Sequence, residues 1–496
     1  MRRSSGEKSV PTALERSLIR GVAWTGGIKW TSQILTWGST LVVARFVPPS
    51  DYGIVGMATL YLGVVGLVGE FGLGAAVITM QKLNEEEIAQ LGGAAVIFGL
   101  AAMLISWAMA WPIGWFFQSP AVPWVVMVMS TNCVISGLRT IPSALLQRDL
   151  DFKTVSLIEL SQGLVSAAAT LLLAVAGEGY WALALGSVVG GLVAAVAFMI
   201  RRPAPRAWPH WPLIREPLKY SAHILGGQLS WWVYSNADFM VAGRVLGSAA
   251  LGAYGLAWEI ANVPVERLTN VITKVTPAHF AALQHDRRAL KRGLLTLTHG
   301  LALVTLPASL GMVLTADDFV RAALGHQWLA AVLPLQLLSA YAGVRSLVTL
   351  LPQILNVTGD SAMTVRMGLL FVTVMPLAFL FGSRWGPPGI AIMWVAVYPV
   401  LTIPFYWRTF LRLECSLAEY LGSLGLALRG CFLMGLAVVA LDWALPVNFP
   451  PLASLAAKAL LGALVYALTA IFPQRRRLLR LFRGLREGTG PLPAES

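Results

Sequence analysis

The chain has 496 residues, of which 56% are hydrophobic and 12% are charged, with a mean hydropathy of +0.68 and a formal net charge of +13. A soluble protein of this length could not bury so much apolar surface, so the composition excludes a water-soluble globular fold. The positive charge is typical of membrane-protein loops that face an anionic leaflet, and we do not expect nucleic acid as a partner.

About fourteen apolar segments are each long enough to cross a bilayer, which takes roughly 20 helical residues. In chain order they cover residues 21–44, 52–80, 88–112, 121–145, 153–176, 180–200, 219–243, 251–275, 293–315, 329–355, 362–382, 388–408, 423–443 and 452–472. The first segment is too long and too polar for the core of a cleaved signal peptide, and we interpret it as a retained helix. The sequence therefore predicts an all-α polytopic membrane protein.

The basic residues predict how these segments are oriented. The odd-numbered connections hold four of the 37 Lys and Arg residues, namely Arg45, Arg244, Arg321 and Arg384, and the tails and even-numbered connections hold most of the others. Basic residues are enriched in cytoplasmic loops. We therefore expect a multi-pass membrane protein with both termini in the cytoplasm.

A connection rich in Pro, Trp and Arg divides the segments into two groups. We predict a basic cytoplasmic tail, a first six-helix bundle, a cytoplasmic linker, a second six-helix bundle, two additional helices and a basic cytoplasmic tail, at residues 1–20, 21–200, 201–218, 219–410, 411–473 and 474–496. The last tail has the pattern of a basic amphipathic helix at a membrane surface.

An internal repeat supports two pseudo-symmetric bundles. Val43-Ala44 is followed, after eight residues, by Gly53-Ile54-Val55-Gly56, and Val241-Ala242 is followed, after nine, by Gly252-Ala253-Tyr254-Gly255. Six segments separate the copies, so both have the same orientation in the membrane. Parallel repeats of this kind are related by an axis along the membrane normal.

Three stretches resemble a known family. Ala44 to Gly53, followed by Glu70-Phe71-Gly72-Leu73-Gly74, resembles the first hairpin of the polysaccharide transporter family, which includes the Wzx-type flippases of O-antigen and exopolysaccharide. Pro142 to Lys153 is a second match, and Asn236 to Tyr254 with Pro277 and Phe280 is a third. The resemblance covers most of segments one to ten.

The resemblance implies a fold, a cargo and a mechanism. The fold is that of the multidrug/oligosaccharidyl-lipid/polysaccharide exporter superfamily, the mechanism is alternating access, and the cargo is an undecaprenyl-diphosphate-linked oligosaccharide. On this basis we expect a flippase of the bacterial cytoplasmic (inner) membrane, a transporter rather than an enzyme, that acts in lipopolysaccharide or exopolysaccharide biosynthesis. A polysaccharide polymerase and chain-length proteins are candidate partners besides membrane lipids.

An anionic headgroup crossing the membrane needs cations within the segments, because a charge in hydrocarbon is costly unless it is paired or hydrated. Of the basic residues Lys29, Arg267, Lys274, Arg345 and Arg366, we predict that Lys29 and Arg345 contact the diphosphate, and we include Arg366 in the substrate site. A structural ion pair or a side chain that snorkels to the membrane surface is the alternative for each.

Ion coupling needs an acid whose protonation or ion binding differs between the two facing states. Glu70, Glu159, Asp238 and Glu259 qualify by their positions within the segments, and Asp238 lies next to Ser235 and Asn236, whose oxygens could help to hold Na⁺. Each could instead be a buried acid that is hydrogen-bonded to hydroxyls and amides. We interpret Glu266 as lying in cytoplasmic water at the end of its helix.

Several other chemistries have no support in the sequence. The three Cys and six His residues show no metal-ligand spacing, and the sequence has no P-loop, so we expect no catalytic residues, no metal and no cofactor beyond a coupling H⁺ or Na⁺. Two alternatives stay open. One is a proton- or sodium-coupled multidrug exporter (an antiporter) of the same fold, whose cavity should be acidic and aromatic. The other is a membrane enzyme, against which the short outer loops argue.

Overall fold

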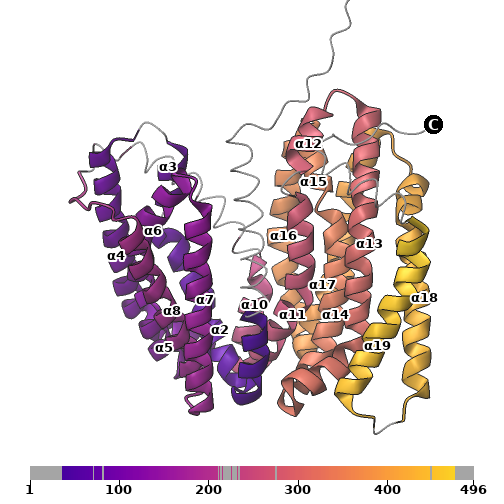
Figure 1. Ribbon diagram of the computed structural model, residues 1–496, viewed down its shortest axis with the longest axis horizontal. Helices are drawn as coiled ribbons and strands as arrows, with labels where there is room; N and C mark the ends of the chain where they lie inside the picture. The colour runs from indigo at the N-terminus through magenta and orange to yellow at the C-terminus, as the bar shows by residue number, and fades with distance from the viewer. Residues whose placement is uncertain are drawn as a thin grey trace, which may run out of the picture. The chain divides into compact units, whose positions relative to one another are not determined.

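A computed structural model describes residues 36–70, 72–80, 83–210, 236–273, 276–446 and 449–474, together with the isolated positions 212, 215, 225, 232 and 235. The side chains of residues 70, 263, 264, 268, 271, 278 and 474 lie outside this description. All regular structure in the described residues is helical (Figure 1). Ten apolar helical stretches in the described residues could cross a membrane by length and composition, and one of them, Ser361–Leu413, contains two long helices of 22 and 28 residues. The predicted all-α, multi-pass fold class is confirmed, and these stretches are consistent with fourteen segments.

The chain forms two compact units. Unit 1 contains the chain up to Asn236 with Gly247–Ala249, and unit 2 contains Ala237–Leu246 and the chain from Ala250 onward. The predicted linker at 201–218 is not tested as a boundary, since several of its residues lie outside the described part of the chain.

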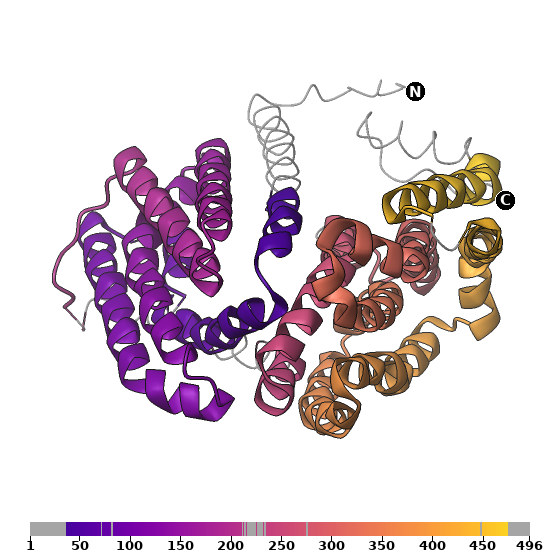
Figure 2. The ribbon, with the colours of Figure 1, turned by 90° about the horizontal axis from the view of Figure 1, so that it is seen from below.

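Unit 1 is a bundle of helices coloured from indigo to magenta in Figures 1 and 2. Its elements are α2 (Pro49–Glu70), α3 (Leu73–Thr79), α4 (Glu85–Phe117), α5 (Val122–Met129), α6 (Thr131–Arg148), α7 (Phe152–Val175) and α8 (Tyr180–Arg201). The predicted segment 52–80 is divided into α2 and α3 at Gly72, whose φ of 65° favours glycine because it has no Cβ. The start of α4 is fixed by a capping box between Asn84 and Glu87.

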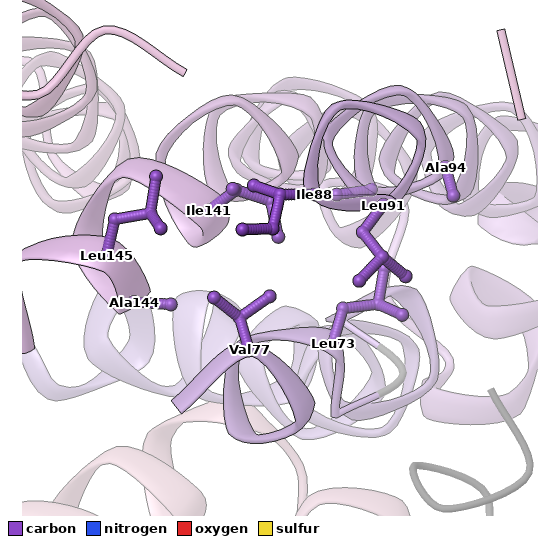
Figure 3. Close-up of a cluster of buried hydrophobic side chains, with 9 residues drawn as sticks. Leu73, Val77, Ile88, Leu91, Ala94, Ile141, Ala144 and Leu145 are labelled. Carbon is purple, nitrogen blue, oxygen red and sulfur yellow. The ribbon is translucent and has the colours of Figure 1, made fainter. Parts of the chain in front are cut away.

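One hydrophobic core cluster of unit 1 lies where α3, α4 and α6 meet. Figure 3 shows Leu73 and Val77 of α3 facing Leu91 of α4 and Ile141 of α6. Each of these four side chains is at most 1% exposed. This contact fixes which side of α6 is buried, and so determines which side of α6 is left for polar residues.

Helices α7 and α8 approach closely through glycines of α8. A Cβ on Gly190 would lie 2.7 Å from the Cβ of Ser166 and 3.0 Å from the backbone oxygen of Gln162, and a Cβ on Gly186 would clash with Thr170. Small residues at a four-residue spacing allow this approach in membrane helices. The approach brings α8 against the stretch of α7 that carries Gln162.

Unit 2 begins with α10 (Ala237–Val241), a π-helical turn (Ala242–Leu246), α11 (Ser248–Thr273), α12 (Thr276–Ala282) and α13 (Arg287–Phe319). It continues with a π turn (Val320–Leu324), a 3₁₀ turn (His326–Ala331), α14 (Val332–Val348), α15 (Leu351–Val357), α16 (Ser361–Gly382), a 3₁₀ turn (Ser383–Trp385) and α17 (Gly386–Leu413). Gly53 and Gly252 of the predicted repeat each lie four residues after the first residue of their helix, Pro49 in α2 and Ser248 in α11.

The two additional helices are α18 (Leu417–Ala444) and α19 (Pro451–Tyr466), the latter followed by turns at Ala467–Ile471 and Phe472–Gln474. Both pack against α13, as the yellow helices of Figure 1 show. Gly430 of α18 leaves room for Tyr466, whose hydroxyl donates a hydrogen bond of 2.8 Å to the backbone oxygen of Leu303. The additional helices therefore contact α13 through polar as well as apolar groups.

Candidate transport site

Three of the predicted charged residues cannot be placed. Lys29 and Lys274 lie outside the described residues, and so does the side chain of Glu70, the last residue of α2. Their predicted roles stay predictions. The other predicted residues are placed within one or the other unit.

Arg345 of α14 forms an ion pair with Glu266 of α11, 79 residues earlier in the chain. The side chains are 27% and 42% exposed. The guanidinium carbon of Arg345 also lies 5.8 Å from the centre of the Tyr341 ring, within cation–π range. Glu266 is thus the partner of a cation within the membrane segment, and an anionic ligand of Arg345 would compete with it.

Asp238 of α10 is fully buried at the centre of a hydrogen-bonded cluster. Its Oδ2 accepts a hydrogen bond of 2.6 Å from the Tyr254 hydroxyl and one of 3.0 Å from Trp394 Nε1, which also lies 3.1 Å from the Tyr254 oxygen. Within the described residues, Oδ1 has no hydrogen-bond partner. A buried carboxylate with one unoccupied oxygen is chemically suited to hold a proton or a small cation at that oxygen.

Aromatic rings connect the two charged positions of unit 2. Trp394 stacks on Tyr341 at a centroid distance of 4.6 Å, and Trp258 lies 5.4 Å from Trp394 and 5.9 Å from Tyr341. Since Trp394 contacts Asp238 and Tyr341 contacts Arg345, a continuous set of packed rings runs from the buried acid to the ion pair.

The remaining predicted residues are not brought together with this cluster by any described contact. Glu259 of α11 and Arg366 of α16 are exposed in unit 2, and Glu159 of α7 is exposed in unit 1. Glu259 lies seven residues before Glu266 on the same helix, so both lie on a similar side of α11. These three residues stay candidates by position alone.

The structure also reveals charged residues within the membrane helices that the sequence analysis overlooked. Arg139 of α6 is half-buried and donates a hydrogen bond of 3.0 Å from Nη1 to Gln162 Oε1 of α7. Arg429 is exposed in the middle of α18, and Lys458 is buried in α19. All three interrupt apolar runs, which is the signal that could have identified them.

Comparison with known proteins identifies the family. Residues 42–333, more than half of the chain, match the family model described as polysaccharide biosynthesis protein. The succinoglycan biosynthesis transport protein ExoT of Rhizobium meliloti is 22% identical over 492 residues, covering 98% of this chain and 99% of the relative. The lipopolysaccharide biosynthesis protein WzxC of Escherichia coli is 24% identical over 437 residues, with 85% and 87% covered.

Solved structures of the same fold agree. The lipid II flippase MurJ in an inward closed conformation has a TM-score of 0.67 at 13% identity, covering 92% of this chain and 99% of that one. An inward-facing multidrug resistance transporter of the MATE family, described as a member of the MOP superfamily, has a TM-score of 0.59 at 14% identity, covering 76% and 94%. The chain therefore has the fold of these proteins, and it belongs to the polysaccharide biosynthesis protein family, as its sequence motifs predicted.

Proposed function

We propose that this protein is a flippase that moves an undecaprenyl-diphosphate-linked oligosaccharide from the inner to the outer leaflet of the cytoplasmic membrane. Its termini would lie in the cytoplasm, and the sugars would be polymerised outside by other proteins. The observation that carries the proposal is the length of the match: a relative named as a transport protein of succinoglycan biosynthesis aligns over 98% of this chain. The lipid II flippase fold likewise covers 92% of the chain.

Arg345 is the described residue best suited to contact the diphosphate. A guanidinium can bind phosphate oxygens through paired N–H donors, and Arg345 already binds a carboxylate oxygen through Nη2. The diphosphate would replace Glu266 as the partner of Arg345, so that no unpaired cation is left within the membrane when cargo leaves. Lys29 and Arg366 stay additional candidate contacts by position.

Asp238 is the leading candidate for ion coupling. Its unoccupied Oδ1 supports binding of H⁺ or Na⁺, and its hydrogen bond to Trp394 links it through the ring cluster to Arg345. Binding of H⁺ or Na⁺ at Oδ1 would neutralise the carboxylate of Asp238 and so change its interactions with Tyr254 and Trp394. In this mechanism the ion biases which side of the membrane the second unit faces. Glu70, Glu159 and Glu259 are the remaining candidates.

One observation favours the second candidate function, a proton- or sodium-coupled multidrug exporter. Unit 2 combines acids with closely packed aromatic rings, which is the chemistry that binds organic cations. However, the Asp238 side chain is fully buried. The packed rings that begin at Asp238 end at Arg345, whose positive charge would repel an organic cation. We therefore keep the exporter as the alternative.

A reconstituted transport assay tests the proposal. Purified protein in proteoliposomes is supplied with undecaprenyl-diphosphate-linked oligosaccharide, and a membrane-impermeant glycosidase reports which leaflet carries the sugar. We expect protein-dependent transfer between leaflets that is accelerated by a proton or sodium gradient. Transfer of a cationic dye without transfer of the glycolipid would establish the exporter instead.

Deletion of the gene in its host gives an independent test. Loss of a flippase should leave lipid-linked oligosaccharide accumulated in the inner leaflet and stop polysaccharide export. Unchanged lipid-linked oligosaccharide together with increased drug sensitivity would overturn the proposal.

A further inference from the structure

The polar residues of α6 lie along one side of that helix. At 100° per residue they fall within an arc of about 100°. They are Asn132, Ser136, Arg139, Thr140, Ser143 and Gln147, and all six are half-buried. We call this set the α6 polar stripe. The other side of α6 is packed in the core through Ile141, Ala144 and Leu145 (Figure 3).

Helices α7 and α8 supply hydrogen-bond partners to the α6 polar stripe. Gln162 of α7 accepts the hydrogen bond from Arg139, and Ser187 of α8 accepts one of 3.4 Å from the Asn132 amide. Within the stripe, the Gln147 amide donates a hydrogen bond of 3.3 Å to the Ser143 hydroxyl. Helices α6, α7 and α8 thus bring amide and hydroxyl side chains together within unit 1.

Arg139 differs from two other buried or half-buried cations of the described membrane helices, Arg345 and Lys458. Arg345 is paired with Glu266, and Lys458 is paired with Asp318, whereas the described hydrogen bond of Arg139 goes to an uncharged amide. No carboxylate lies within ion-pair distance of Arg139 in the described part of the chain. A positive charge within a membrane segment is costly, and one without an acidic partner typically marks a ligand pathway.

The geometry leaves Arg139 able to take an anion. A guanidinium carries five N–H donors in a plane, and Gln162 occupies one of them through Nη1. The side chains of the stripe, Arg139 included, are each partly exposed, so neighbouring helices cover them only in part. The backbone of Gln162 lies at the close approach of α7 and α8 at Gly190, and its side chain accepts the hydrogen bond that orients the guanidinium.

We infer that the α6 polar stripe is a binding site for the sugar headgroup of the cargo, in which Arg139 binds an oxyanion and the amides and hydroxyls bind sugar hydroxyls. This inference rests on the proposed function, since it assigns the cargo's recognition to unit 1. The oxyanion is either the carboxylate of an acidic sugar or a phosphate of the diphosphate, because both present paired oxygens to a guanidinium.

The test compares two synthetic undecaprenyl-diphosphate oligosaccharides that differ at one position, a neutral hexose against a hexuronate. Binding to the purified full chain in detergent is measured by intrinsic tryptophan fluorescence, and transfer between leaflets is measured separately in proteoliposomes. The variants are Arg139→Gln, Arg139→Lys and Gln162→Leu. Arg429→Gln is the matched control, since Arg429 is a mid-helix arginine outside the stripe.

We expect Arg139→Gln to weaken binding about tenfold or more, the usual effect of losing a charged hydrogen bond. Arg139→Lys should restore part of the affinity, Gln162→Leu should weaken binding less, and Arg429→Gln should leave it unchanged. A loss confined to the hexuronate cargo identifies the sugar carboxylate as the ligand, and an equal loss for both cargoes identifies the diphosphate.

Wild-type affinity of Arg139→Gln for both cargoes would overturn the inference. Size-exclusion profiles show whether each variant is folded, and if Arg139→Gln is not, Arg139→Lys and Gln162→Leu decide by the same criterion. The two proposals fail separately. Binding that depends on Arg139 without transfer between leaflets would refute the flippase function and support the binding site. Transfer that is unaffected in Arg139→Gln, Arg139→Lys and Gln162→Leu would support the flippase function and refute the binding site.

Discussion

The ammonium nitrogen of Lys458 in α19 lies 2.6 Å from a carboxylate oxygen of Asp318 in α13. Lys458 is only 6% exposed and also pairs with Asp442 of α18. One lysine therefore joins the two additional helices to each other and to unit 2. A charge this deeply buried is stable only while its partners stay in place.

Removing this lysine should destabilise the attachment. In Lys458→Met the apolar stem is kept but the carboxylate of Asp318, 15% exposed, is left without its partner. We expect a loss of about 3 kcal/mol, the usual cost of leaving a buried charge unpaired. Thermal unfolding followed by size-exclusion chromatography in detergent measures it. Arg321→Met, which breaks the exposed pair with Asp317, is the control and should leave the melting temperature nearly unchanged.

Asp238→Asn separates ion coupling from folding. The asparagine oxygen can still accept the hydrogen bonds from Tyr254 and Trp394, so the cluster should stay packed. The neutral amide can no longer take up a proton at the unoccupied oxygen. We expect leaflet transfer that no longer responds to an ion gradient, with near-normal thermal stability. A variant that keeps its full gradient response would show that coupling lies elsewhere, and Asp317→Asn is the control.

Arg345 and Glu266 should have opposite effects on cargo affinity. If the diphosphate replaces Glu266, then Arg345→Gln weakens cargo binding, whereas Glu266→Gln removes a competing anion and strengthens it. A purely structural ion pair predicts instead that both variants weaken binding. The double variant completes a thermodynamic cycle for stability, in which we expect a coupling energy of about 1 kcal/mol since both side chains are partly exposed.

Gly190→Val should separate α7 from α8. The new side chain would overlap Ser166 and the backbone of Gln162, and overpacking of this kind costs about 2 kcal/mol. Because Gln162 holds Arg139, the variant should also weaken cargo binding. Gly368→Val in α16 is the control, since a Cβ there meets nothing within 4 Å. Equal melting temperatures for the two variants would contradict the close contact between α7 and α8.

Asp360 should make the stability of the folded chain depend on pH in the acidic range. It lies between α15 and α16, where Arg408 and Arg412 of α17 donate hydrogen bonds of 2.6 and 3.2 Å to Oδ2. The hydrogen bond from Arg408, aided by that from Arg412, holds the pKa of Asp360 below its ordinary value. A lowered folded-state pKa gives stability that is complete above the unfolded pKa, about 3.9, and is lost as the pH falls through the folded value.

Melting temperatures measured from neutral pH down to about pH 3 test this contribution. The wild-type chain should lose stability over the acid end of that range by more than Asp360→Asn does, since the variant has no proton to gain at this position. Parallel curves for the two chains would show that the two arginines do not stabilise the ionised carboxylate.

Much of the fold could be predicted from the sequence. The predicted segments 153–176, 180–200 and 362–382 agree with α7, α8 and α16 to within one residue at each end. Breaks within segments were missed, such as the one between α2 and α3, because a long apolar run hides a single glycine with positive φ. The roles of the predicted site residues stay predictions, and Arg139 was missed although it interrupts the apolar run of the predicted segment 121–145.

The sequence by itself determined the class of fold, the family and the approximate positions of the described membrane helices. In hydrocarbon every backbone polar group must be satisfied within its own helix, so a membrane helix is specified locally by its run of apolar residues. Only the tertiary structure decided which charged and polar groups meet: Glu266 with Arg345, Asp238 with Trp394, and Lys458 with Asp318. These partners lie 79, 156 and 140 residues apart. Their contacts depend on how helices pack, which the apolar pattern of any one helix does not specify.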